Sequence, residues 1–219
     1  MNSKLKRYLL LPWSLYFNVR YLPFKQAMKF PILLESIPVC TGKGTIELVG
    51  DITRGMVVLG GVLAGFYRKN PFIFSNDGKV VFHPGVCIRG NAYISCGKDA
   101  TITFKQDVKV NNGCRFIAKK GIILGKDCRI GWDCTFIDND YHILWDIVAD
   151  RPCKSEQPIE LGEGCWIGHD CVISKGTRLM DFSNVSSFSK VQLRTRKPNT
   201  IISGNPAQVV DEGYRIHLG

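Results

Sequence analysis

Aliphatic side chains recur every six residues in the second half of this 219-residue chain. Steps of six land on Leu161, Ile167, Ile173, Leu179, Val185 and Val191. An α-helix repeats about every 3.6 residues and a strand about every two, so neither element alone explains this period. The period is typical of coils made of short strands joined by turns. Such coils stack into a solenoid because one coil cannot bury its apolar residues alone.

A second position of the repeat, four residues after the aliphatic one, carries a small side chain. It holds Cys114, Cys128, Cys134, Cys165 and Cys171, and then Thr177, Ser183 and Ser189. Buried free cysteine behaves as a small hydrophobe, so we expect these five cysteines to be unreactive core residues. The nine cysteines are odd in number and contain no CxxC pair. This pattern argues against a complete disulfide framework and favours a reducing compartment.

Glycine often follows the aliphatic residue, as at Gly125, Gly131, Gly162 and Gly168. We expect these glycines to supply a permissive backbone at the corners of the coil. The repeat is interrupted between Phe136 and Leu161, which predicts an inserted loop over 137–160. Insertions of this kind are natural places for function.

The inserted loop carries His142, which follows Asp138 and Asp140. Histidine has a pKa near neutrality, which suits a general base, and a nearby carboxylate can orient its ring. Asp140 is preferred to Asp138 for that orienting role by a narrow margin. Taken alone, a loop histidine is more often a bystander than a catalyst.

The repeat pattern resembles that of the hexapeptide-repeat acyltransferases. Two further segments are similar to the late signatures of that family: Cys165-Trp166-Ile167-Gly168 and Ser203-Gly204-Asn205-Pro206-Ala207. The likeness covers roughly residues 80–210 and is greatest to galactoside, maltose and capsular-polysaccharide O-acetyltransferases. It implies a left-handed parallel β-helix with three hexads per coil. It also implies a homotrimer with active sites between neighbouring coils.

The resemblance assigns roles to several residues. His142 becomes the general base, and Asn111 faces the active site, although a turn role for Asn111 stays open. The coenzyme lies along the late coils, where Phe182 to Val210 contain four cations and no acid. The residues expected to bind it are Trp166, Lys190, Arg194, Arg196 and Lys197. The acidic Asp211 and Glu212 depart from the basic tail that is usual in the family.

The chain is therefore expected to be an all-β left-handed β-helix with a helical N-terminal appendage. Three segments are predicted: a basic amphipathic segment 1–43, an acyltransferase domain 44–204 and a tail 205–219. Residues 1–36 hold six cations against Glu35 alone, mixed with aromatic and leucine residues. This segment either lies on an anionic membrane surface, through residues 1–30, or caps the main domain.

The expected activity is acetyl transfer from acetyl-CoA to a hydroxyl of a sugar or surface-polysaccharide intermediate. A cytoplasmic location follows, with peripheral contact to the inner membrane face left open. Two alternatives remain: an amino-sugar N-acetyltransferase and a noncatalytic membrane-surface scaffold. No metal is expected, because the closely spaced histidine pair of β-helical carbonic anhydrases is absent. A net charge of +10, spread along the chain without a nucleic-acid module, does not predict a nucleic-acid partner.

Overall fold

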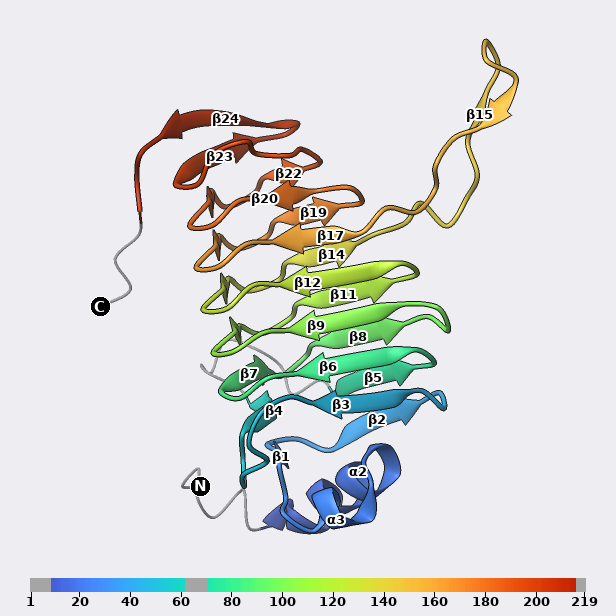
Figure 1. The fold of residues 1–219 in the computed structure, drawn as a ribbon, viewed down its shortest axis with the longest axis vertical. Coiled ribbons are helices and arrows are strands. Elements are labelled where there is room, and N and C mark those ends of the chain that lie inside the picture. Colours follow the sequence, from blue (N-terminus) through green and yellow to red (C-terminus); the bar gives the residue numbers. More distant parts are fainter. Residues whose placement is uncertain (1–8, 62–70, 216–219) are drawn as a thin grey trace.

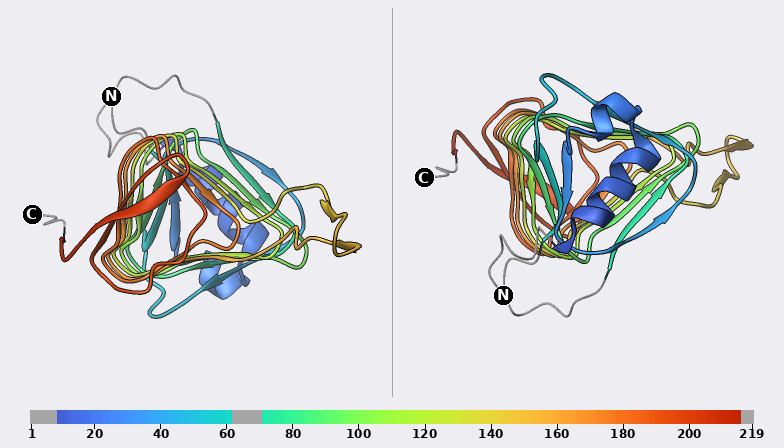
Figure 2. Two further views of the ribbon diagram at one scale, coloured as in Figure 1. Left: turned by 90° about the horizontal axis from the view of Figure 1, so that it is seen from above. Right: turned by 90° about the horizontal axis from the view of Figure 1, so that it is seen from below.

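Strands in this chain stack on three faces of a parallel β-helix, shown in Figure 1. The structure is a computed structural model that describes residues 9–61 and 71–215. Successive strands take the first, second and third faces in turn, so three strands make one coil. Figure 2 shows the triangular cross-section that results.

The first face contains β1 (Ile32–Leu34), β4 (Val57–Gly61), β7 (Val86–Arg89), β10 (Lys109–Val110), β13 (Arg129–Ile130), β18 (Trp166–Ile167), β21 (Asn184–Val185) and β23 (Thr200–Gly204). The second contains β2 (Pro38–Thr41), β5 (Phe72–Asn76), β8 (Tyr93–Cys96), β11 (Arg115–Ala118), β14 (Thr135–Ile137), β19 (Val172–Ser174) and β22 (Lys190–Val191). The third contains β3 (Thr45–Leu48), β6 (Lys79–Phe82), β9 (Thr101–Phe104), β12 (Gly121–Leu124), β17 (Ile159–Leu161) and β20 (Arg178–Leu179). At the C-terminal end, β24 (Ala207–Glu212) pairs antiparallel with β23.

The solenoid is left-handed, as expected. In Figure 1 the front strands β9, β12 and β17 run to the left, the strands behind them run to the right, and the chain climbs. All neighbouring strands on one face are parallel until β24, as in Ile130↔Ile167 and Ile167↔Val185. Because successive strands lie on successive faces, residues six apart in sequence occupy equivalent positions on neighbouring faces.

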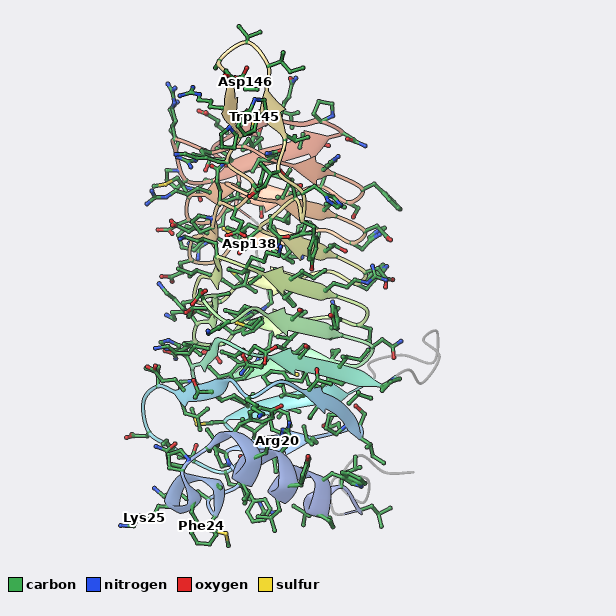
Figure 3. The ribbon with its side chains drawn as sticks, turned by 90° about the vertical axis from the view of Figure 1, so that its right-hand side faces the viewer. Arg20, Phe24, Lys25, Asp138, Trp145 and Asp146 are labelled. Carbon is green, nitrogen blue, oxygen red and sulfur yellow. The ribbon has the colours of Figure 1, made fainter. Side chains whose placement is uncertain are left out.

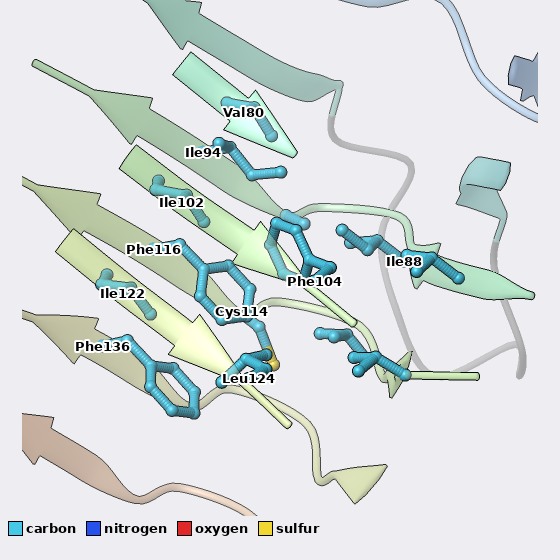
Figure 4. Packing of buried hydrophobic residues seen from close by; sticks show 14 of the residues in the cluster. Val80, Ile88, Ile94, Ile102, Phe104, Cys114, Phe116, Ile122, Leu124 and Phe136 are labelled. Atoms are coloured by element: carbon cyan, nitrogen blue, oxygen red, sulfur yellow. The ribbon is translucent and has the colours of Figure 1, made fainter. Parts of the chain in front are cut away.

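The aliphatic positions of the repeat point into the solenoid and are buried, which confirms the prediction. Figure 4 shows Ile102, Phe104, Phe116 and Ile122 meeting in the interior. Aromatic rings continue this contact from coil to coil, with ring centroids 4.9 Å apart between Phe116 and Phe136. The core is thus a continuous column rather than a separate cluster in each coil.

The small position of the repeat is also buried, and all five predicted cysteines lie there without solvent exposure. Each side chain donates a hydrogen bond to a backbone carbonyl at a corner. Cys134 Sγ donates to Gly168 O at 3.0 Å, and Ser189 Oγ donates to Ser186 O at 2.7 Å. The neighbouring Cys114 thiol and burial raise the pKa of Cys134, so its sulfur stays protonated.

The corner glycines were expected to supply a permissive backbone, but the structure gives them a different role. Positive φ angles fall on Asp127, Asp133 and Asp170, not on the glycines that follow the aliphatic residues. A Cβ on Gly131 would lie 2.6 Å from His169 N in the next coil. These glycines are needed because the backbones of stacked coils approach closely at the corners.

Two helices close the N-terminal end of the solenoid: α2 (Leu11–Tyr21) and α3 (Phe24–Ala27). Leu22 ends α2 in an extended conformation because it precedes Pro23. The Phe17 ring is buried, with its centroid 5.2 Å from that of Phe74. The helical appendage therefore caps the N-terminal end of the solenoid.

The cap also provides hydrogen-bond partners for the edge strand β1. Asn18 Nδ2 donates to Ile32 O at 2.8 Å, and Ile32 N donates to Asn18 Oδ1 at 3.2 Å. Leu34 N donates to Ser14 Oγ at 3.0 Å. An open strand edge can pair with another chain and so promotes aggregation. Asn18 and Ser14 bind the backbone groups of β1 and so block pairing at this edge.

The stack of coils begins at β1, earlier than the predicted residue 44. The connection from β3 to β4 is longer than the short corners of later coils. The six-residue step is lost there, although the parallel pairing is kept.

Candidate active site

An arm leaves the solenoid between β14 and β17, at the corner between the second and third faces. We call this the second corner. The arm has an outgoing leg, a returning leg and a small antiparallel sheet between them. The sheet pairs β15 (Trp145–Asp146) with β16 (Arg151–Pro152). Figures 1 and 2 show it projecting away from the coils. The arm coincides with the predicted insertion.

Asp138 anchors the base of the arm. Its buried carboxylate accepts hydrogen bonds from the backbone N–H groups of Lys119, Lys120 and Gly121, at 2.8, 2.8 and 2.6 Å. Asn139 Nδ2 donates to the same carboxylate at 3.0 Å. These contacts fix where the chain leaves the solenoid, so Asp138 has a structural role in this arrangement.

Lys175 joins both legs of the arm to the next coil. Its ammonium group is ion-paired with the Asp140 carboxylate on the outgoing leg. The same group donates to Lys154 O on the returning leg at 2.7 Å. The Lys175 side chain is only 12% exposed, which favours a defined geometry. Sequence reasoning missed this residue because nothing local marks it.

His142 lies on the outgoing leg and is exposed. Within residues 9–61 and 71–215, its ring makes no hydrogen bond to either Asp138 or Asp140. The orienting role of Asp140 therefore stays a prediction. The preceding Tyr141 is held by Lys119, whose Nζ lies 4.6 Å from the ring centroid. Burial raises the pKa of Tyr141.

A second group of predicted residues surrounds the corner between the first and second faces, the first corner. Asn111 follows β10 at this corner and is half-buried. Trp166 lies on β18 just before the corner, with 36% of its side chain exposed, and pairs with Arg129 and Asn184 in adjacent coils. Lys190 is the first residue of β22, which follows the first corner one coil after Trp166, and its side chain is exposed.

An aromatic column occupies the same first corner and was not predicted. The Trp132 and His169 rings are stacked, with centroids 4.6 Å apart and planes 7° apart. The Phe188 ring meets His169 edge-on at 4.8 Å. His169 Nδ1 lies 2.8 Å from Asp170 Oδ2, so this imidazole has the carboxylate partner that His142 lacks in the single chain.

The remaining predicted cations follow β22. The backbone of Arg194 forms a parallel β-bridge with that of Arg178, the first residue of β20 on the third face. The Arg194 side chain donates a hydrogen bond from Nε to Gly176 O at the second corner. Arg196 is exposed beyond it. Lys197 is ion-paired with Glu212 at 2.7 Å, so the acidic tail noted in the sequence neutralises one of the four cations.

The structure thus divides the candidates between two corners of the triangle. Asn111, Trp166 and Lys190 are at the first corner, whereas His142, Asp140 and Arg194 are at the second. The strand order makes this division firm, because one whole face separates the two corners in every coil. Arg196 and Lys197 belong to neither group.

The described residues show two further features relevant to function. They contain no group of three His, Cys, Asp or Glu side chains that could hold a metal ion. Within the same ranges, no helix is long and apolar enough to span a membrane.

Comparisons with known proteins find several solved structures that are similar to this chain. No family model and no curated protein sequence matches the chain. A hexapeptide-repeat acetyltransferase from Vibrio cholerae, solved with acetyl coenzyme A, is similar over 55% of this chain and 64% of its own, under two thirds of its length, with 23% identity and a TM-score of 0.45. A polysialic-acid-specific acetyltransferase is similar over 86% and 87%, with 18% identity and a TM-score of 0.47.

A galactoside acetyltransferase solved with coenzyme A is similar over 96% of this chain and 82% of its own, with 16% identity and a TM-score of 0.45. These identities and scores are low, so the fold assignment rests on the strand pairing of this chain itself. That pairing defines the class of protein: a three-sided, left-handed parallel β-helix with one inserted arm.

Proposed function

We propose that this protein is an acyltransferase that moves an acetyl group from acetyl-CoA to a hydroxyl of a sugar or surface-polysaccharide intermediate. The observation that carries the proposal is the position of the candidate residues in the solenoid. Asn111, Trp166 and Lys190 lie at the first corner, and His142 lies on the arm that leaves the second corner. The resemblance of the repeat and of the Cys165–Gly168 segment to hexapeptide-repeat acyltransferases supports the same activity.

His142 acts in this proposal as the general base. Its neutral ring removes the proton of the acceptor hydroxyl while the oxygen attacks the thioester carbonyl. The carbon–sulfur bond then breaks, and the proton passes to the departing coenzyme A thiolate. No covalent enzyme intermediate is required, which agrees with the burial of the five core cysteines.

The coenzyme lies along the late coils at the first corner. Trp166 offers an exposed ring beside the pantetheine chain, and Lys190 offers a positive charge for a phosphate. Arg194 lies at the second corner and Arg196 beyond it, so neither adds charge at the first corner of the same chain, and Lys197 is engaged by Glu212. Asn111 faces the reacting groups at the same corner.

A homotrimer completes the site. His142 and Asn111 occupy different corners of one chain, and the arm points away from the coils rather than back across a face. A second copy can place its first corner against this arm. A head-to-tail contact of this kind closes a threefold ring when it relates successive copies by a third of a turn.

A reducing compartment, and hence the cytoplasm, suits this protein best. All nine cysteines are free thiols in the structure, although several lie on adjacent coils. An amino-sugar N-acetyltransferase remains the alternative, because an amine acceptor needs the same base. A noncatalytic scaffold is the remaining alternative.

Calorimetry with acetyl-CoA on the wild-type chain tests the proposal directly. Binding in the micromolar range is expected, and it distinguishes an enzyme from a scaffold. Absence of binding to a folded trimer would contradict the proposal. A screen of sugar and amino-sugar acceptors then separates O- from N-acetylation.

The His142→Ala variant tests the general base. Turnover should fall about 10²- to 10⁴-fold, the usual contribution of a general base, with folding unchanged. His83→Ala is the matched control, because His83 lies at the corner between the third and first faces, away from both groups. Equal turnover in the two variants would refute the assignment.

A further inference from the structure

The outer surface of the N-terminal cap is apolar and aromatic although it faces solvent. Phe24 is 69% exposed and Met28 is 50% exposed, while Trp13, Tyr16 and Val19 line the outer side of α2. The opposite side of α2 packs Phe17 onto the solenoid, so these five side chains are not needed for the core. Figure 3 shows Phe24 projecting from the base of the molecule, away from the coils. We call these five residues the base face.

Positive charge surrounds the base face. Arg20, Lys25 and Lys29 are exposed beside it, and the sequence contains no acidic residue before Glu35. Arg20 donates to Tyr16 Oη and to Gly42 O, which holds it at the edge of the face. Within the described residues, Lys25 and Lys29 make no ion pair, so their charges remain available.

We propose that the base face docks on an anionic lipid bilayer. Aromatic rings with apolar bodies partition to the interface between headgroups and acyl chains, as Trp13, Tyr16 and Phe24 would here. Lysines beside them gain from the negative surface potential of anionic lipids. A protein partner is less well matched, because its surface would need both a groove for Phe24 and an unbroken acidic rim.

This docking fixes how the solenoid stands on the bilayer. The cap closes the end of the stack, so the solenoid rises from the surface and the arm leaves it four coils above the first. Stacked strands are about 4.8 Å apart, which places the base of the arm roughly 20 Å above the first coil. Where the proposed transfer reaction holds, its acceptor is then a glycan extended from the membrane, not a lipid headgroup.

Co-sedimentation of the full-length chain with phosphatidylcholine vesicles, with and without phosphatidylglycerol, tests the docking. The wild type should bind the anionic vesicles and be released by high salt. A triple variant Phe24→Ser, Lys25→Glu and Lys29→Glu should bind at least about tenfold more weakly. The matched control, Lys98→Glu and Lys105→Glu, makes the same charge change on exposed residues away from the base face and should bind nearly as the wild type does.

Three results would overturn the docking. The first is no binding of the folded wild type to anionic vesicles. The second is equal weakening in the triple variant and the control, which would indicate a general charge effect. The third is a change in oligomeric mass of the triple variant without vesicles, which would make the base face a contact between copies. Circular dichroism checks that the variants fold, and acetyl-CoA binding is measured separately, so failure of docking is distinguishable from failure of the proposed function.

Discussion

At the scale of single residues, the carboxylate of Asp138 has the clearest energetic consequence. It is buried and accepts three backbone hydrogen bonds from the preceding coil. In Asp138→Asn, an amide N–H₂ replaces one acceptor oxygen and faces N–H donors. A buried polar group left without a partner costs about 1–3 kcal/mol, so we expect stability to fall by about that amount. Urea unfolding measures it, and Asp99→Asn, an exposed position, should cost almost nothing.

Lys175 affects the mobility of the arm more than the stability of the fold. The Asp140 carboxylate is 33% exposed and stays solvated when its partner is removed, so Lys175→Met should change the free energy of unfolding by less than about 1 kcal/mol. The two legs of the arm lose their shared anchor, however. Hydrogen exchange should therefore accelerate at the amides of Asp140 and Cys153, which are protected by Ser155 O and Leu144 O. Unchanged exchange at these amides would show that the backbone pairing alone holds the arm.

At the scale of the strand and its corner, the small repeat position sets the volume of each coil. Ser183 and Ser189 occupy this position in later coils, so Cys134→Ser should keep the hydrogen bond to Gly168 O and cost little. Cys134→Leu forces extra atoms into a packed column and should cost about 1–3 kcal/mol. Thermal or urea unfolding of both variants measures the difference. Cys153→Leu on the exposed arm is the control, and a similar loss there would contradict a packing origin.

The elements differ in how far the sequence predicts them. The six-residue spacing and the small position predict the coils, because both are local and repeat. The insertion is visible as a break in that spacing. The roles of Asp138 and Lys175 are not visible, because each depends on contacts between coils that are distant in sequence. The aromatic column was missed because the arm separates Trp132 from His169 and hides their alignment. Aligning the residues that follow Ile130 and Ile167 by two positions would have found that pair.

At the scale of the whole molecule, the arm decides whether one chain can form a complete site. Ile147 and Val148 near its tip are 89% and 99% exposed, which is unfavourable for an arm that stays in water. If the first corner of a second copy covers these residues, Val148→Asp should convert the trimer to a monomer in light scattering. It should also abolish acetyl transfer, because Asn111 and His142 no longer meet, while acetyl-CoA binding at the late coils is weakened less. Val39→Asp changes an exposed residue on β2 in the first coil, several coils away from the arm and from Asn111, and should leave mass and turnover unchanged. A monomeric wild type with full turnover would contradict a shared site and require the arm of one chain to reach its own first corner.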